Sequence, residues 1–92
     1  MKIYKFQLTG SECEINMPFG STILSVGVQN NEDVMIWAKC HEGAIEVPRR
    51  FKVVPTGGDV PEMGTFIGTV LMYNGTLIFH VFEDNTQSPV KL

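Results

Sequence analysis

Hydrophobic and polar residues alternate in short runs along most of the chain, and glycine, proline and asparagine separate the runs. Alternation with a period of two is typical of β-strands, and no window of about a dozen residues carries the spacing of an amphipathic helix. The pattern predicts an all-β protein, either a small antiparallel sandwich or a partly open barrel. About seven short strands are expected, at Lys2 to Leu8, Cys13 to Met17, Thr22 to Gln29, Asp33 to His41, Ile45 to Val54, Thr65 to Tyr73 and Thr76 to Phe82.

The clearest element is a hairpin centred on Asn74-Gly75. Both central residues of a type I′ turn need a positive φ, which Asn and Gly tolerate. The turn pairs one face as Tyr73 with Thr76, Leu71 with Ile78, Thr69 with His80 and Ile67 with Phe82, and the other as Met72 with Leu77, Val70 with Phe79 and Gly68 with Val81. Both faces are then largely apolar, so we expect protein to cover both of them.

The face that holds Leu71 and Ile78 predicts self-association. Each large apolar side chain contributes ~1.5–3 kcal/mol when fully buried, so several together match the ~4–15 kcal/mol cost of association. The N-terminal strand, with Tyr4, Phe6 and Leu8, could cover this face, but so short a chain favours a second copy around a twofold axis. The expected interface residues are Ile67, Leu71, Tyr73, Ile78, His80 and Phe82.

The two central strands are joined by the loop Asn30-Asn31-Glu32. Matching apolar faces pairs them as Val28 with Val34, Val26 with Ile36 and Leu24 with Ala38. If the second of these strands also pairs with the strand that follows it, Ile36 lies beside Phe51 and Val34 beside Val53. In that arrangement Arg50 lies directly across from Trp37.

An aromatic and cationic platform would then occupy the opposite face, on a floor of Ser25 and Gly27. Its members are Trp37, Lys39, His41, Arg50 and Lys52. An indole stacks on a base for ~1–3 kcal/mol and Arg offers forked donors to phosphate, so the platform suits a small anionic ligand with a ring, such as a nucleotide. The alternative is a solvated sheet face on which Arg50 covers Trp37.

The segment Pro55 to Gly64 is long for a loop in so small a domain. Long ordered loops are often functional, and adjacent glycines can present backbone N–H groups to an anion. Thr56, Gly57 and Gly58 are therefore candidates for a lid over the ligand, with a plain strand crossover as the alternative.

The sequence offers few groups for catalysis. Cys40 and His41 are consecutive strand residues, so their side chains point to opposite faces and cannot share a proton. His80 is expected to hydrogen-bond to a neighbouring hydroxyl. The cysteine and histidine spacing matches no common zinc site, and Cys13 and Cys40 are expected to be free thiols. We expect no enzyme activity, no metal and no cofactor.

Composition limits the chain further. With 92 residues, 43% hydrophobic and 18% charged, it has room for one packed domain, expected at 1–84 with a loose tail at 85–92. A net charge of −3 offers no general attraction to nucleic acid or to an anionic membrane. The absence of a signal-like start and of a membrane-length apolar run favours the cytoplasm.

Five segments resemble small uncharacterised single-domain proteins of bacteriophages and prophages, over about residues 1 to 84. They are Met1 to Phe6, Ile15 to Val26, Phe51 to Gly57, Phe66 to Thr69 and Phe79 to Glu83. The long loop differs, since Gly58-Asp59-Val60-Pro61 stands where such proteins often have a Gly-His-Pro-like sequence.

The resemblance implies a phage-encoded protein acting in the host cytosol. Small oligomeric phage β-proteins include inhibitors that sequester nucleotide signals of host immunity. The expected function is therefore non-enzymatic capture of a small anionic ligand, such as a cyclic nucleotide or an ADP-ribose derivative. The alternative is a protein-interaction or virion accessory domain without such a ligand.

Overall fold

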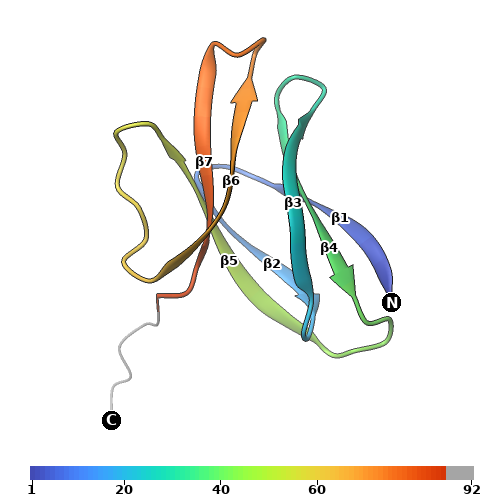
Figure 1. Cartoon of the computed structure of the whole chain (residues 1–92). Coiled ribbons are helices and arrows are strands. Elements are labelled where there is room, and N and C mark those ends of the chain that lie inside the picture. Colours follow the sequence, from blue (N-terminus) through green and yellow to red (C-terminus); the bar gives the residue numbers. More distant parts are fainter. Residues whose placement is uncertain (87–92) are drawn as a thin grey trace.

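The computed structural model of the chain describes residues 1–86. The described chain forms seven strands: β1 (Lys2–Leu8), β2 (Glu12–Pro18), β3 (Thr22–Gln29), β4 (Asp33–Cys40), β5 (Glu46–Pro55), β6 (Gly64–Met72) and β7 (Leu77–Asp84). They make two antiparallel sheets packed together, with the strand orders β1-β4-β3 and β2-β5-β7-β6 (Figure 1). The molecule measures 41 × 36 × 17 Å, and its short dimension is that of two stacked sheets. The predicted all-β class is confirmed, in its sandwich form.

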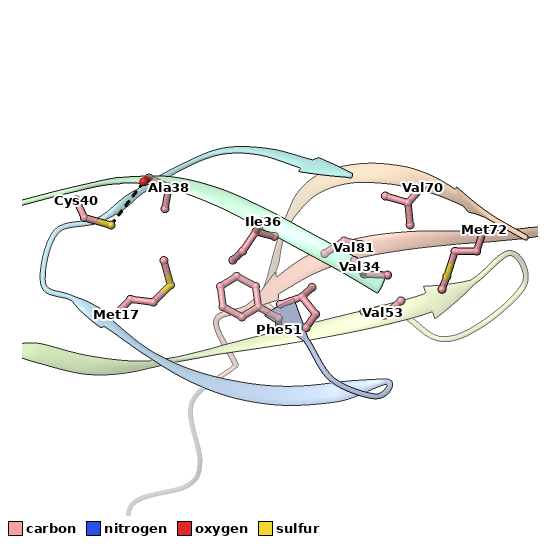
Figure 2. Packing of buried hydrophobic residues seen from close by; sticks show 11 residues of the cluster. Met17, Val34, Ile36, Ala38, Cys40, Phe51, Val53, Val70, Met72 and Val81 are labelled. Carbon is pink, nitrogen blue, oxygen red and sulfur yellow. Dashed lines mark hydrogen bonds between the residues drawn. The ribbon is translucent and has the colours of Figure 1, made fainter. Parts of the chain in front are cut away.

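The predicted pairing of β4 with β5 is wrong. Both edges of β4 are occupied within its own sheet, by β1 and by β3, while β5 lies between β2 and β7 in the other sheet. Ile36 and Phe51 do share the core, but they approach it from facing sheets rather than from neighbouring strands (Figure 2). The sequence argument matched the apolar faces of the strands. That match is the same whether β4 and β5 pair within one sheet or face each other from two sheets, because both arrangements bury the same alternate residues.

The core fills the space between the two sheets. Its buried members are Leu8, Met17, Val34, Ile36, Ala38, Cys40, Phe51, Val53, Val70, Met72 and Val81. Phe51 is 1% exposed and stands near the middle of this cluster (Figure 2). The buried residues of β4 are mainly the even-numbered ones and those of β5 mainly the odd-numbered ones, so each strand buries one face as the alternation predicts.

The β6–β7 hairpin keeps the predicted register from Met72 opposite Leu77 to Gly68 opposite Val81. Asn74 and Gly75 have the predicted positive φ values, 57° and 82°, but Tyr73 also has a positive φ, 50°, and the ladder ends at Met72 opposite Leu77. The Tyr73 carbonyl accepts the Thr76 N–H at 3.2 Å, but the Tyr73 N–H is donated to Asn31, so the predicted strand pairing of Tyr73 with Thr76 is wrong. A bulge at Ile67 then places Phe66, rather than Ile67, opposite Phe82.

The β3–β4 hairpin likewise follows the predicted register from Val28 opposite Val34 to Val26 opposite Ile36. A second bulge at Leu24 puts Ile23 opposite Ala38, so the predicted pairing of Leu24 with Ala38 is wrong. Each bulge adds one residue to a strand, which reverses the faces of the residues beyond it.

One side of the sandwich is closed by a seam between β3 and β6. At its end, the backbone carbonyl of Asn31 accepts the Tyr73 N–H at 2.9 Å. The side-chain oxygen of the same Asn31 accepts the Asn74 N–H, also at 2.9 Å. Along the seam the backbone at Gly68 comes so close to Val26 that an added Cβ would lie 2.6 Å from Val26 Cγ1. The two hairpins are therefore fastened together at their tips and sides.

After β7, Asn85 donates its N–H to the Met63 carbonyl at 2.6 Å and Thr86 Oγ1 accepts the Met63 N–H at 3.1 Å. These contacts hold the start of the predicted tail against the β5–β6 loop, and its residues 87–92 lie outside the described residues. Within residues 1–86, no helix is long and apolar enough to cross a membrane.

Candidate functional site

Trp37 lies on the outer face of the three-stranded sheet, partly buried. Its neighbours across the sheet are Lys5 on β1 and Ser25 on β3. Gly27 lies beneath the indole, since a Cβ added there would be 3.3 Å from the ring. The predicted floor of Ser25 and Gly27 is therefore present, and Lys39 is exposed two residues along β4, on the same face.

The cationic half of the predicted platform is not beside Trp37. Arg50 and Lys52 lie on β5, pointing outward from the other sheet, opposite Glu14 and Glu12 respectively. The Lys52 ammonium is 3.9 Å from the Glu12 carboxylate, and the Arg50 guanidinium donates to the Thr86 carbonyl. The prediction that Arg50 lies across from Trp37 is wrong, because β1 and β3 occupy both edges of β4.

His41 follows the end of β4 and is exposed. The predicted platform is thus split between the two outer faces of the sandwich, and only Trp37 and Lys39 remain together on one strand face.

The β5–β6 loop does not reach Trp37 either. Gly57, with a φ of 89°, turns the chain so that the Gly58 N–H donates to the Pro55 carbonyl at 2.8 Å. Gly58 packs on Val54, which is only 3% exposed although it points away from the core. Thr56 Oγ1 is also 2.8 Å from His80 Nε2 on β7, so the segment Thr56 to Gly58 lies on the outer face of the four-stranded sheet, whereas Trp37 belongs to the other sheet.

An apolar surface covers the outward side of the β6–β7 hairpin. We call it the outer hairpin face, and its residues are Phe66, Thr69, Leu71, Ile78, His80 and Phe82. Phe66, Leu71 and Ile78 are 56%, 58% and 44% exposed. The Phe66 and Phe82 rings meet edge to face with centroids 5.4 Å apart. Large apolar side chains on neighbouring strands thus form one surface.

His80 lies between the apolar pairs of this surface. Its Nδ1 is 2.9 Å from Thr69 Oγ1 and its Nε2 is 2.8 Å from Thr56 Oγ1. The predicted hydrogen bond from His80 to a neighbouring hydroxyl is confirmed, and both ring nitrogens have a partner. The two threonine hydroxyls therefore hold the His80 ring in place on this surface.

Two covers were considered for the face that holds Leu71 and Ile78, the N-terminal strand and a second copy, and the structure excludes the N-terminal strand. β1 belongs to the other sheet, where Phe6 and Leu8 face the common core, so it cannot cover Leu71 and Ile78. Of the predicted interface residues, Leu71, Ile78, His80 and Phe82 share the outer hairpin face. Ile67 is turned toward the core by the bulge, and Tyr73 lies in the turn.

A charged pair inside the sandwich was missed by the sequence analysis. Arg49 Nε and Nη2 each donate to a carboxylate oxygen of Glu83 at 2.6 Å, and the two side chains are only 19% and 14% exposed. The third nitrogen donates to the Ser21 carbonyl in the β2–β3 turn. The hydrogen bond to Glu83 raises the pKa of Arg49 above its usual value. The sequence did contain a signal for this pair. Arg49 lies two residues before the buried Phe51 on β5, so both side chains point to the same inward face.

Two thiols lie in or near the core and both are free. Cys40 is fully buried, with its sulfur 3.2 Å from the Ser21 hydroxyl, and Cys13 is partly buried. In the part of the chain that the structure describes, no three His, Cys, Asp or Glu residues gather closely enough to hold a metal ion.

At the end of β7, the pKa of the Asp84 carboxyl is held below its usual value. The largest cause is the hydrogen bond from the Thr86 backbone N–H, followed by the Thr86 side chain and the nearby charges of Arg50 and Lys52. Arg50 and Lys52 of β5 are therefore close enough to Asp84 to stabilise its charged form.

Comparison with known proteins places the chain in a family. No match was found among curated proteins, and none was found among solved structures. A family model described as "Domain of unknown function (DUF7352)" matches residues 1–91, which is nearly the whole chain. The chain therefore belongs to the DUF7352 family.

Proposed function

We propose that this protein is a non-enzymatic interaction module that self-associates through the outer hairpin face. The observation that carries the proposal is the apolar surface formed by Phe66, Leu71, Ile78 and Phe82. Within residues 1–86, the first three of these side chains are exposed and Phe82 is partly exposed. Exposed apolar surfaces of this kind on small proteins commonly mark sites of protein contact.

The apolar energy available at this surface supplies a large part of what a dimer needs. Phe66, Leu71 and Ile78 each retain about half of their exposure, so their burial in both copies would contribute roughly 5–9 kcal/mol. Association costs ~4–15 kcal/mol. At the most favourable ends of the two ranges the surplus is about 5 kcal/mol, which corresponds to a Kd of a few tenths of a millimolar. A dimer at micromolar concentration therefore also needs contacts from Phe82 and from the rim of the surface.

Burying this surface costs little in unpaired polar groups. None of its six residues is an acid, a Lys or an Arg, and His80 already has a hydroxyl partner at each ring nitrogen. A twofold axis would bring the same apolar pairs of both copies into contact, because such an interface uses one surface twice. A second copy is therefore a suitable partner for this face.

Light scattering after size-exclusion chromatography tests this proposal. We expect the unaltered protein to give a mass that is a multiple of 10.3 kDa. Leu71→Lys, Ile78→Lys and the pair together should lower that mass, because a buried lysine at the interface has no partner. Both residues point outward, so circular dichroism should show the fold retained.

Ile45→Lys is the matched control, since Ile45 is an isoleucine of 76% exposure in the loop between β4 and β5. It should leave the mass unchanged. Equal masses for the unaltered protein and Leu71→Lys, or equal losses in Leu71→Lys and Ile45→Lys, would contradict the proposed interface.

A second candidate function is capture of a small anionic ligand with a ring, such as a nucleotide signal of host immunity. It is favoured by Trp37, which is partly exposed over Gly27 between Lys5 and Ser25. The resemblance to phage and prophage proteins supports both candidates, as a virion accessory or as an anti-defence protein in the host cytosol.

Thermal unfolding with a panel of cyclic and linear nucleotides tests the second candidate. A ligand at one hundred times its Kd should stabilise the fold by about 2.7 kcal/mol and raise the Tm by several degrees. Trp37→Ala should abolish the shift, whereas Arg50→Ala, on the opposite outer face, should keep it. The absence of a shift with every nucleotide would refute capture of this ligand class.

A further inference from the structure

His80 occupies the middle of the outer hairpin face. Along β7 it lies between Ile78 and Phe82, whose side chains point to the same side of the sheet. On β6, Leu71 lies opposite Ile78 at one end of the face, and Phe66 lies opposite Phe82 at the other. Of the six residues of this face, the one that gains a charge near neutral pH is therefore at its centre.

The His80 ring can keep both of its hydrogen bonds in either charge state. Its Nδ1 is 2.9 Å from Thr69 Oγ1 and its Nε2 is 2.8 Å from Thr56 Oγ1. A neutral imidazole donates from one nitrogen and accepts at the other, whereas an imidazolium donates from both. A hydroxyl can donate or accept, so each threonine serves both forms by turning its O–H bond. A single copy of the chain can thus hold the charged ring as well as the neutral one.

The neighbouring strands offer no acid that would compensate a charge on His80. Within residues 1–86, no carboxylate lies within ion-pairing distance of either ring nitrogen. β6 presents Thr69 to the ring, and β5 presents Val54 directly opposite. Lys52 points outward two residues before Val54, but it is itself a cation, and its ammonium is 3.9 Å from the Glu12 carboxylate. A charge on His80 therefore meets apolar, hydroxyl or cationic groups on these strands.

The β5–β6 loop and β7 itself add no compensating acid. The loop contacts the ring through Thr56, and the loop acids Asp59 and Glu62 are exposed without an ion pair to the ring in the described chain. On β7, Glu83 is on the opposite face of the strand, where it is occupied by its own cation. Water therefore has to stabilise an imidazolium at His80, and this requires an open face.

A second copy on this face removes that water. A twofold interface uses the same surface twice, and apolar pairs lie on both sides of His80, so the axis would pass near the centre of the face and bring the two rings together. Two charged rings would then be desolvated and would repel each other. Two neutral rings would keep their threonine partners without this cost. The dimer therefore selects the neutral form of His80.

We infer that self-association through the outer hairpin face is controlled by pH, with protonation of His80 separating the two copies. The inference rests on the proposed function, because it concerns the same surface. A dimer that holds two neutral rings takes up protons when it dissociates into copies with charged rings. Its association is thus strongest at high pH and weakens as the pH falls through the range in which histidine becomes charged, about pH 8 to 5.

Sedimentation equilibrium at about pH 8 and about pH 5.5 tests the inference. For the unaltered protein we expect the dimer Kd to rise at least about tenfold at the lower pH, with an unchanged circular dichroism spectrum. His80→Gln should have the same Kd at both pH values, because its amide donates and accepts hydrogen bonds but gains no charge. His80→Phe should also lose the pH dependence, and it supplies a second uncharged side chain if glutamine weakens the dimer at both pH values.

His41→Gln is the matched control, since His41 is the other histidine of the chain and is exposed after the end of β4, in the other sheet's region. It should keep the full change in Kd. An equal Kd at both pH values in the unaltered protein, or a change that persists in both His80 variants, would overturn the inference and leave the interface intact. A monomer at pH 8 would instead overturn the proposed interface, and this inference with it.

Discussion

Replacing Glu83 by alanine is expected to lower the free energy of unfolding by about 3 kcal/mol, the lower end of the range for breaking a buried ion pair. Arg49 would keep its charge in a site where it is 19% exposed, with both donors to Glu83 left unpaired. The lower end applies because water still reaches part of both side chains. This pair also fixes the β2–β3 turn, through the bond from Arg49 to the Ser21 carbonyl.

Urea unfolding at neutral pH measures this effect. Arg49→Met should lower the free energy of unfolding by a similar amount, because it leaves the Glu83 carboxylate without its partner. The double variant Arg49→Met with Glu83→Leu should cost clearly less than the sum, since it leaves no unpaired charge. Losses below about 1 kcal/mol for either single variant, or additive losses, would show that the pair does not hold the fold.

Gly68→Ala is expected to be the next most damaging change, at about 1–3 kcal/mol of unfolding free energy, the usual cost of overpacking. The new Cβ would lie 2.6 Å from Val26 Cγ1, so β3 and β6 would have to separate. Gly68 is not among the glycines with positive φ, so the alanine backbone fits and the cost comes from the contact alone.

Val26→Ala supplies the test of that cause. It removes the methyl group that meets the new Cβ, so Gly68→Ala in this background should cost only a few tenths of a kcal/mol, while each change alone costs more. If Gly68→Ala is neutral in the unaltered protein, or if its cost is the same in both backgrounds, the β3–β6 seam is not closely packed at this point.

Local signals predicted the strands and turns well. The Asn-Gly pair gave the positive φ values of Asn74 and Gly75, and the three-residue loop from Asn30 to Glu32 set the pairing of β3 with β4. The two bulges were not predictable from alternation. At Leu24 and at Ile67 the neighbouring residue is also apolar, so either of the two could have faced the core.

The candidate site was harder to predict because it depended on which strands are neighbours. Ile36 and Phe51 contribute to one core whether β4 and β5 pair within a sheet or face each other from two sheets. Only the first arrangement brings Arg50 to Trp37, and the structure has the second. The outer hairpin face does not depend on how β4 and β5 are placed, because its members lie on two strands joined by a short turn.

The buried ion pair of Arg49 and Glu83, by contrast, was predictable from the alternation of residues along β5 and β7. Arg49 falls in phase with Phe51 and Val53, and Glu83 in phase with Val81, so both charges were placed on the inward faces. Two inward charges of opposite sign on strands of one sheet predict a pair, since neither could be buried alone.

The central claim is that this chain assembles with copies of itself, and sedimentation equilibrium of the unaltered protein tests it most directly. Between about one and one hundred micromolar, the weight-average mass should rise to a multiple of 10.3 kDa, as expected when all interface contacts together exceed the cost of association by about 6–8 kcal/mol. A mass that stays at 10.3 kDa across this range would contradict the claim.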